Sequence, residues 1–304
     1  MYFIEHDIFD YGYKQSLSLL FSKGQEVSPR GIKTLELSPF VFRLYSPRTR
    51  FIQNANRDIN LGLNIVEFLN IIGGNNSVSI FDGLSENIKK FSDDGVTFRG
   101  GYGPRLRNEE IDQFKLVIDK LKSDSFSRQA IMTIFDPAID YVETKDVPCT
   151  INFHFLLRNN RLKMNVYMRS NDAILGHAID IFVFTMIQEV IANELGVELG
   201  EYNHFVGSFH LYEKDFIKAE KIINNTDKFE EMPKMVGKLG DAWRCYSHVV
   251  QNYEWRLFHD YWNDLKLSVL YQKKLKNKEQ IDINKLNDKI YKQYFERKLL
   301  WQEN

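Results

Sequence analysis

A thiol, an arginine–serine pair, two aspartates and a histidine–tyrosine pair follow one another through the middle of this sequence. In chain order they are Cys149, Arg169, Ser170, Asp172, Asp180, His210 and Tyr212. A thiolate is a soft nucleophile that adds to carbons such as C6 of a pyrimidine ring, which makes C5 nucleophilic in turn. A guanidinium binds phosphate oxygens. The set therefore suits the handling of a pyrimidine nucleoside monophosphate.

Cys149 has a second interpretation, as a buried cysteine that acts only as a small hydrophobic side chain. It follows a proline in Asp146-Val147-Pro148-Cys149-Thr150, at the start of an expected strand. Arg169 is expected to return beside it across a hairpin, and a nearby guanidinium favours the thiolate. Spacing alone leaves the catalytic and the structural role of Cys149 open.

The pattern of apolar residues predicts the elements that must position this set. Alternation over 149–157 and 161–168, on either side of Arg158-Asn159-Asn160, predicts a β-hairpin. Strands are predicted over 32–44, 130–135 and 202–212, helices over 60–72, 111–122 and 179–195, and a helical region from 241 onward. The hairpin is the element expected to bring Arg169 back beside Cys149.

Size and composition set the class of protein. The 304 residues, 43% of them hydrophobic, are enough for one large single-core domain, or for one domain with an appendage. A net charge of -1 gives no general case for binding nucleic acid or membranes, so phosphate recognition must come from a local basic cluster. The two cysteines are expected to be free thiols. With neither a secretory signal nor a membrane span in the sequence, we expect a cytoplasmic protein.

The order and spacing of the motifs resemble the thymidylate synthase superfamily over residues 30–212. Its members carry Pro-Cys-His at the nucleophile, then Gln-Arg-Ser-Cys-Asp, then Leu-Gly, a base-reading asparagine and Gly-x-x-His-x-Tyr. The matching positions are Cys149, Arg169-Ser170, Asp172, Leu175-Gly176, Asp180, Gly207, His210 and Tyr212. The resemblance implies an enzyme, a one-carbon transferase, with an α+β thymidylate-synthase-like fold. In that fold a large mixed sheet with flanking helices forms a sheet-to-sheet homodimer.

Four residues would be catalytic by this resemblance: Cys149, Glu67, Asp172 and Tyr102. Cys149 would be the nucleophile. Glu67, which lies among apolar residues, would order water and move protons on the ring, and Tyr102 would bring its hydroxyl to the site. The alternatives are an exposed helix carboxylate for Glu67 and an ordinary loop residue for Tyr102.

Seven residues would bind the substrate by the same resemblance. They are Arg30, Arg128, Arg169, Ser170, Asp180, His210 and Tyr212. The arginines and the serine would contact the 5′-phosphate, with Arg128 reaching the nucleotide of the partner subunit, so that the homodimer shares its active sites. The histidine and the tyrosine would hold the sugar 3′-hydroxyl. Gln129 stands where the family has a second arginine, which implies a rearranged phosphate clamp. The alternative for each arginine is an ordinary surface role.

Asp180 stands where the synthases carry asparagine, and this position reads the base. Uracil presents N3–H as a donor and O4 as an acceptor, which asparagine complements. Cytosine presents N3 as an acceptor and a 4-amino donor, which a carboxyl group complements when protonated or bridged by water. A mismatch leaves buried polar groups unpaired, at about 1–3 kcal/mol each. Asp180 therefore predicts cytosine, while its alternative role is to cap the helix that follows.

Further departures resemble the cytidylate hydroxymethylase branch. Thr150 and Asn171 replace a histidine and a cysteine of the synthases, and no tryptophan precedes Trp243. Loss of an aromatic shield would admit water to the methylene carbon. The expected function is 5-hydroxymethylation of CMP or dCMP with 5,10-methylenetetrahydrofolate and water, through a covalent adduct of Cys149 with C6. The alternatives are a thymidylate or uridylate synthase and a non-catalytic nucleotide- or RNA-binding homologue.

The expected organisation is a catalytic domain over 1–240 and a helical C-terminal extension over 241–304 packed on it. No metal is expected, because His177, His204 and His210 lack convincing ligand spacing. Neither a membrane nor a nucleic acid is an expected partner.

Overall fold

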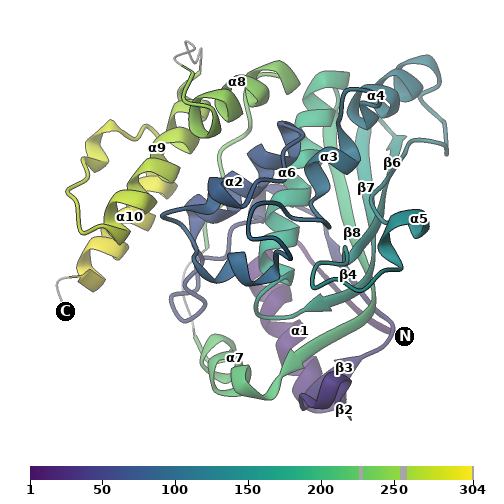
Figure 1. The fold of residues 1–304 in the computed structure, drawn as a ribbon, viewed down its shortest axis with the longest axis vertical. Coiled ribbons are helices and arrows are strands. Elements are labelled where there is room, and N and C mark those ends of the chain that lie inside the picture. Colours follow the sequence, from purple (N-terminus) through teal and green to yellow (C-terminus); the bar gives the residue numbers. More distant parts are fainter. Residues whose placement is uncertain (226–228, 254–258, 303–304) are drawn as a thin grey trace. The chain divides into compact units, whose positions relative to one another are not determined.

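The structure is a computed structural model, and it describes residues 1–225, 229–253 and 259–302 (Figure 1). The chain divides into two compact units, each built from separate stretches of sequence. The first unit contains Met1–Ile59, Lys115–Asp136 and Pro148–Met232, and the second contains Asn60–Phe114, Pro137–Val147 and Pro233–Asn304. The domain boundary expected near residue 240 stays a prediction.

Eight strands of the described residues form one mixed sheet in the first unit, in the order β1-β4-β8-β7-β6-β5, with β3 pairing with β8 and β2 with β3. The strands are β1 (Tyr2–His6), β2 (Gln25–Val27), β3 (Thr34–Leu37), β4 (Phe40–Leu44), β5 (Ile131–Thr133), β6 (Thr150–Arg158), β7 (Arg161–Asp172) and β8 (Glu198–Tyr212). β1 and β4 are parallel, as are β7 and β8, and the other pairs are antiparallel. The predicted strands are confirmed, each within a few residues.

The hairpin of β6 and β7 is the part of the sheet that positions the candidate nucleophile. Asn159 and Asn160 form its turn with φ of 51° and 55°. Asparagine tolerates this left-handed conformation, and two such residues give the turn whose twist matches that of the flanking strands. The antiparallel register then pairs Thr150 with Met168. A register shift between Thr150 and Asn152 moves the pairing by one residue, so the turn and this irregularity together place Cys149 beside Arg169.

A buried helix, α6 (His177–Leu195), packs on β7 and β8 in the first unit. Every residue from Ile181 to Ala192 is buried, so this helix has no solvent-facing stripe, as its continuous apolar sequence predicts. The imidazole of His177 lies among aromatic rings of α1, β4 and β8. These rings belong to Phe9, Tyr13, Phe40, Phe42 and Phe209, with centroids 4.9–6.3 Å from that of His177.

The other helices of the first unit are α1 (Phe9–Lys23), α7 (Phe216–Ile223) and, apart from its first two residues, α4 (Gln113–Ser123). Short 3-10 turns occur at η1 (Pro29–Gly31), η2 (Pro47–Thr49) and η5 (Glu213–Asp215). The Tyr13 hydroxyl donates to the carbonyl oxygen of Ala173 at 2.8 Å. This bond ties α1 to the segment that follows β7.

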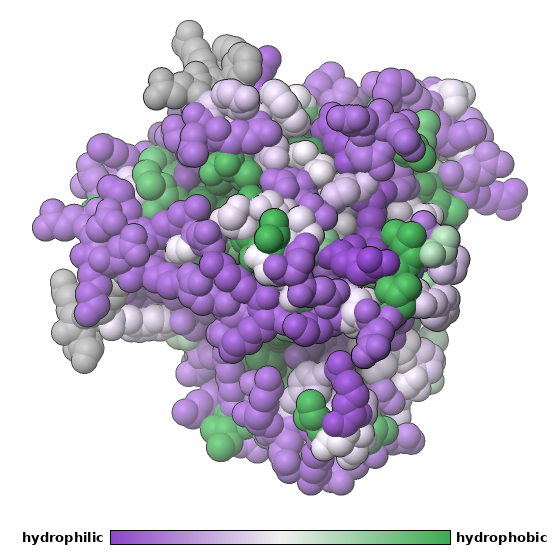
Figure 2. Space-filling model, viewed as in Figure 1, coloured by the Kyte–Doolittle hydropathy of each residue, from purple (hydrophilic) through white to green (hydrophobic). Residues whose placement is uncertain are grey.

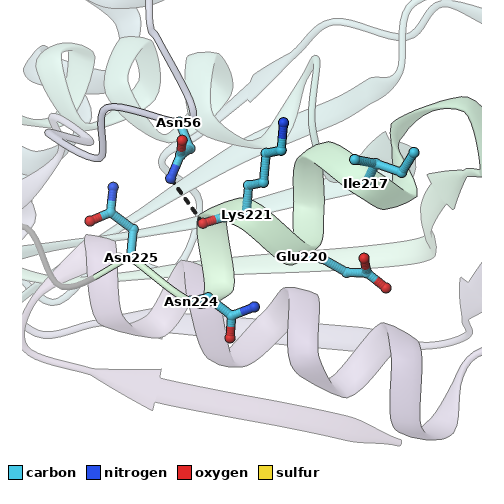
Figure 3. A pocket seen from close by; sticks show the side chains of 6 residues that line it. All are labelled: Asn56, Ile217, Glu220, Lys221, Asn224 and Asn225. Atoms are coloured by element: carbon cyan, nitrogen blue, oxygen red, sulfur yellow. Dashed lines mark hydrogen bonds between the residues drawn. The ribbon is translucent and has the colours of Figure 1, made fainter.

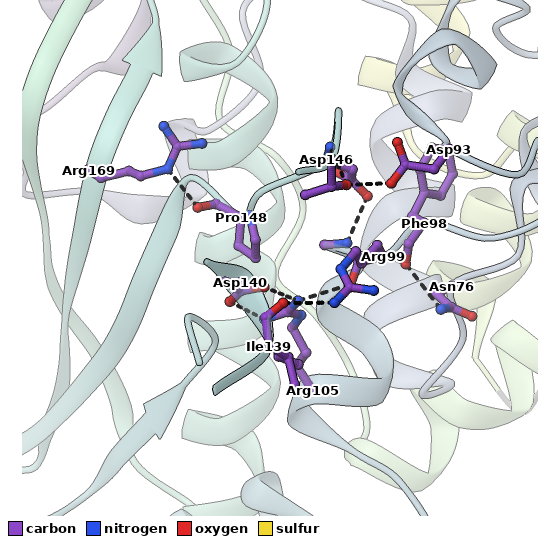
Figure 4. A network of polar contacts seen from close by, with 12 residues as sticks. Asn76, Asp93, Phe98, Arg99, Arg105, Ile139, Asp140, Asp146, Pro148 and Arg169 are labelled. Atoms are coloured by element: carbon purple, nitrogen blue, oxygen red, sulfur yellow. Dashed lines mark hydrogen bonds and ion pairs between the residues drawn. The ribbon is translucent and has the colours of Figure 1, made fainter. Parts of the chain in front are cut away.

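The second unit is mainly helical. Its elements are α2 (Leu61–Ile72), η3 (Val78–Phe81), η4 (Asn87–Phe91), α3 (Tyr102–Leu106), α5 (Pro137–Asp140), α8 (Leu239–Val250), α9 (Asp260–Lys276), η6 (Ile283–Lys285) and α10 (Lys289–Gln302). Asn60 caps α2, because its side chain accepts a hydrogen bond from the backbone N–H of Leu63, and Gly73 follows the last turn. The predicted helices over 60–72 and beyond 241 are therefore confirmed. Arg105 and Asp140 form a buried bidentate ion pair in this unit, with both N–O distances 2.7 Å (Figure 4).

Hydrophilic residues predominate on the face of the molecule drawn in Figure 2, where hydrophobic residues appear in small separate groups. None of the helices in the described ranges is both long and apolar enough to cross a membrane.

Candidate active site

Cys149 lies directly before β6, and Arg169 lies beside it on β7. The backbone N–H of Arg169 donates to the carbonyl oxygen of Cys149 at 2.8 Å, and the Arg169 Nε donates to that of Pro148 at 2.9 Å (Figure 4). Cys149 is partly exposed and Arg169 is exposed. The predicted return of Arg169 across the hairpin is therefore confirmed, and Arg169 is bonded to the backbone of both Cys149 and the residue before it.

Ser170, His210 and Tyr212 lie at the ends of β7 and β8, on neighbouring strands. The parallel register pairs Ser170 with Ser208 and Asp172 with His210. The Ser170 Oγ lies 3.5 Å from the His210 Nδ1, and the rings of His210 and Tyr212 are 5.1 Å apart. All three side chains are partly exposed. The structure thus brings together the residues expected to hold phosphate and sugar, while their roles stay predictions.

Asp172 ends β7 and is held by the backbone that follows it. Its Oδ1 accepts hydrogen bonds from the N–H groups of Ile174 and Leu175, at 2.8 and 2.9 Å. This turn fixes the orientation of the Asp172 carboxylate at the end of β7.

Asp180 lies in the first turn of α6, one turn beyond the cap position. The N-cap residue of α6 is Gly176, and the backbone N–H of Asp180 donates to the Gly176 carbonyl oxygen. The alternative that Asp180 caps this helix is therefore wrong, because the helix begins earlier than the sequence predicts. Its Oδ2 accepts from the amide Nδ2 of Asn171 at 2.6 Å. Burial, with a smaller contribution from the charge of Asp172, raises the pKa of Asp180 to about 7.

This raised pKa predicts a pH-dependent stability. The folded state keeps a proton on Asp180 that the unfolded state releases between its ordinary pKa of 3.8 and about 7, so stability falls as pH rises through this window. The Asp180→Asn variant cannot ionise at this position. We therefore expect its unfolding free energy, minus that of the native chain, to be larger at pH 8 than at pH 4 by about 2 kcal/mol or more. Urea unfolding at both pH values measures this. An equal difference at both values would contradict it, and the exposed Asp119→Asn is the control.

Sequence reasoning missed a cluster of buried polar residues next to Asp180. In the sequence, Asn171 stands out only as a departure from the family, and His177 and His204 only as residues without convincing metal-ligand spacing. The structure places both imidazoles on the Asn171 amide oxygen and the Tyr202 hydroxyl on His204. The available signal was polar residues inside segments that are otherwise continuously apolar.

Arg30 and Arg128 are exposed residues of the first unit. Arg30 lies in the turn η1 with φ of 54°, and Arg128 follows the buried Ser127. Glu67 and Tyr102 belong to the second unit, where α2 carries Glu67, Tyr102 begins α3, and these two helices pack together. The roles of all four residues stay predictions.

A polar surface pocket along α7 lies apart from these residues within the first unit (Figure 3). It is lined by Asn56, Ile217, Glu220, Lys221, Asn224 and Asn225. Its Asn56 amide donates to the carbonyl oxygen of Lys221 at 3.0 Å. None of the predicted site residues lines this pocket.

Comparison with known proteins identifies the family of this chain. A family model described as thymidylate synthase matches residues 11–287. The chain therefore belongs to the thymidylate synthase family. Thermostable thymidylate synthase A of Bacillus subtilis has a similar structure, with a TM-score of 0.64, 21% identity, and coverage of 73% of this chain and 86% of that one. The predicted α+β thymidylate-synthase-like fold is confirmed.

Two curated relatives have names that are more specific than that of the family. The deoxyuridylate hydroxymethyltransferase of Bacillus phage SP01 is 35% identical over 220 residues, which cover 67% of this chain and 57% of that protein. That of Pseudomonas phage M6 is 34% identical over 172 residues, which cover 55% and 49%. This chain thus spans about half the length of the curated relatives that it matches.

Proposed function

We propose that this protein is an enzyme that adds a hydroxymethyl group to C5 of a pyrimidine nucleoside monophosphate. The observation that carries the proposal is the partly exposed residue Cys149 beside Arg169 across the β6–β7 hairpin, in a chain of the thymidylate synthase family. The names of the two phage relatives support hydroxymethylation over methylation. The absence of tryptophan before Trp243 supports it too, since fewer aromatic side chains are then available to keep water out.

The reaction begins as the Cys149 sulfur adds to C6, which makes C5 nucleophilic. C5 forms a bond to the methylene carbon of 5,10-methylenetetrahydrofolate. C5 then loses its proton, and tetrahydrofolate leaves as the bond between that carbon and the folate nitrogen breaks. Water adds to the exocyclic methylene carbon to give the hydroxymethyl group, and the Cys149 sulfur leaves C6. Arg169 and Ser170 hold the 5′-phosphate, Arg30 adds a charge, and His210 and Tyr212 hold the sugar. Glu67 and Tyr102 are the proposed proton-handling residues.

The proposed co-substrate is 5,10-methylenetetrahydrofolate, which supplies the one-carbon unit. The structure offers one group that fits its pterin ring. Asp172 has its Oδ1 held by two backbone N–H groups, and its Oδ2 is the atom that we propose accepts from the N–H groups of a pterin. A homodimer in which Arg128 reaches the phosphate of the partner subunit completes the proposal.

Uracil is the base that we propose. Asparagine complements uracil, and a carboxyl group that is protonated or bridged by water complements cytosine. At a pKa of about 7, Asp180 is substantially neutral at neutral pH, and a neutral carboxyl group has one donor and one acceptor, as asparagine does. It therefore complements uracil as well as asparagine would. The deoxyuridylate named for both relatives then favours dUMP.

Cytosine nucleotides are the second candidate, because Asp180 replaces the asparagine that reads uracil in the synthases. A carboxyl group that gives its proton to N3 accepts from both N3–H and the 4-amino group. This pairing gives cytosine two hydrogen bonds to a charged group.

Tritium release from C5 of dUMP, dCMP, UMP and CMP, each with the folate, tests the proposal. We expect release from dUMP with kcat/KM at least about tenfold above that for dCMP, and a 5-hydroxymethyl product on chromatography. Faster release from dCMP or CMP would establish the second candidate. A methyl product would show a synthase, and no release from any nucleotide would favour a non-catalytic homologue.

A further inference from the structure

A chain of buried polar side chains leads from the core of the first unit to Asp180. Tyr202 and His204 of β8 and His177 of α6 are fully buried, and Asn171 at the end of β7 is 3% exposed. Asn171 stands at the centre, because its amide contacts both imidazoles and the Asp180 carboxyl group. Buried polar groups are costly unless they are paired, so this arrangement has a defined hydrogen-bond pattern.

The direction of each hydrogen bond follows from the chemistry of the groups. Burial lowers the pKa of His177 well below its ordinary value and that of His204 to about 3, so both rings are neutral with one N–H each. His177 Nδ1 and His204 Nε2 lie 2.9 and 3.1 Å from the Asn171 Oδ1, which can only accept. These nitrogens therefore carry the hydrogens, and the His204 Nδ1 accepts from the Tyr202 hydroxyl at 2.7 Å. Two donors on one oxygen fix the direction of the Asn171 amide.

The fixed amide in turn orients Asp180. The Asn171 Nδ2 donates to the Asp180 Oδ2 at 2.6 Å, so Oδ2 is an acceptor and the proton of the neutral carboxyl group lies on Oδ1. Gly176 makes room for this contact. A Cβ at that position would lie 2.9 Å from the Asn171 Nδ2 and 3.2 Å from the Asp180 Oδ2. Asp180 therefore offers a hydrogen-bond donor at Oδ1 and an acceptor at Oδ2, and the contact with Asn171 fixes this assignment.

This assignment distinguishes the two bases. A donor facing position 4 and an acceptor facing position 3 complement uracil through O4 and N3–H, whereas the reverse order complements cytosine through its 4-amino group and N3. The ring is held at C6 by Cys149 and at the phosphate by Arg169, so each carboxyl oxygen faces one position of the ring. Reversal of the order requires the Asn171 amide to turn over, and both histidine donors oppose that.

We propose that Asn171, oriented by His177 and His204, is a positioning residue that sets the base preference of the enzyme through Asp180. The inference rests on the proposed function and names the residues that make position 180 selective. Asn171 contacts Asp180 and acts on the base only through it.

The test compares kcat/KM for dUMP and dCMP, measured by tritium release, in matched variants. We expect Asn171→Leu to lower the preference for the better base at least about tenfold, because Asp180 then takes its proton on either oxygen. His204→Leu should act in the same direction, whereas His204→Gln, which keeps an N–H near the Nε2 position, should retain the preference. Asn165→Leu is the control. It removes another half-buried asparagine of β7, whose Oδ1 accepts from Asn203, and should leave the preference unchanged.

If Asn171→Leu does not fold, Tyr202→Phe tests the same preference. The Tyr202→Phe substitution removes only the hydroxyl that fixes the His204 tautomer. We expect it to lower the preference about threefold or more. Nitrogen-15 NMR of the native protein should find the hydrogen on Nδ1 of His177 and on Nε2 of His204. The opposite tautomers would overturn the role of Asn171 but not the proposed function. An unchanged base preference in an active Asn171→Leu or Tyr202→Phe variant would do the same. A native enzyme that turns over no pyrimidine nucleotide would overturn the proposed function and the base preference with it.

Discussion

Cys149→Ala should abolish turnover while the protein still folds and binds nucleotide. The sulfur is the proposed nucleophile, and removal of a covalent nucleophile lowers kcat by about 10⁴-fold or more. The thiol is partly exposed, so its loss leaves no buried cavity and should change the unfolding free energy little. Tritium release measures turnover, and calorimetric titration with dUMP measures binding, which we propose depends on Arg169 and Ser170 rather than on the sulfur.

Cys245→Ala is the matched control, because it removes the other thiol of the chain. Cys245 is fully buried in α8, burial raises its pKa to about 12, and its Sγ lies 3.7 Å from the carbonyl oxygen of Trp262. It is therefore a core residue and a poor nucleophile. Turnover should survive Cys245→Ala, and iodoacetamide should modify Cys149 alone in the native protein. Turnover of the Cys149→Ala variant within tenfold of the native rate would exclude covalent catalysis by this residue.

The placement of Arg169 near Cys149 could be predicted from the sequence to within about one residue, because it depends on local rules. Two alternating segments on either side of Asn159-Asn160 specify a tight hairpin, and the length of its turn specifies the register from Arg158 and Arg161 as far as Asn152 and Tyr167. The register shift between Asn152 and Thr150, which moves the pairing by one residue next to Cys149, leaves no such signal. Local rules also predict α2, whose cap Asn60 and terminal Gly73 are both visible in the sequence.

The buried polar network could not be predicted in this way. His177, His204 and Asn171 belong to three different elements, and their meeting depends on the parallel pairing of β7 with β8 and on the packing of α6. Neither the pairing nor the packing leaves a periodic signal. The wrong N-cap role for Asp180 has a related cause. The sequence placed the start of α6 at residue 179, whereas the helix begins at His177, and Asp180 faces Asn171 instead of the helix terminus.

Glu189→Gln should be the most destabilising of the single substitutions considered for the first unit. Glu189 lies in α6 with 2% of its side chain exposed, and it pairs with the fully buried Arg50, which follows η2. Arg48 adds a more distant contact at 3.7 Å. Glutamine keeps the shape but removes the charge, so the buried Arg50 guanidinium loses the charge of the Glu189 carboxylate. Loss of one partner of a buried ion pair costs about 3–5 kcal/mol, which urea unfolding detects as a lower midpoint.

A second ion pair of α6, in which Glu194 pairs with Lys122 of α4, serves as the control. It separates the loss of the buried ion pair from a general loss of stability on substitution in α6. Glu194 lies 4.0 Å from Lys122, and both side chains are more exposed than Glu189. Glu194→Gln should therefore cost about 1 kcal/mol or less. The double variant Arg50→Met with Glu189→Leu removes both buried charges and should recover most of the lost stability, since apolar side chains of similar size replace a costly buried pair. Equal losses for Glu189→Gln and Glu194→Gln would mean that the ion pair of Arg50 with Glu189 does not stabilise the first unit in the way its burial implies.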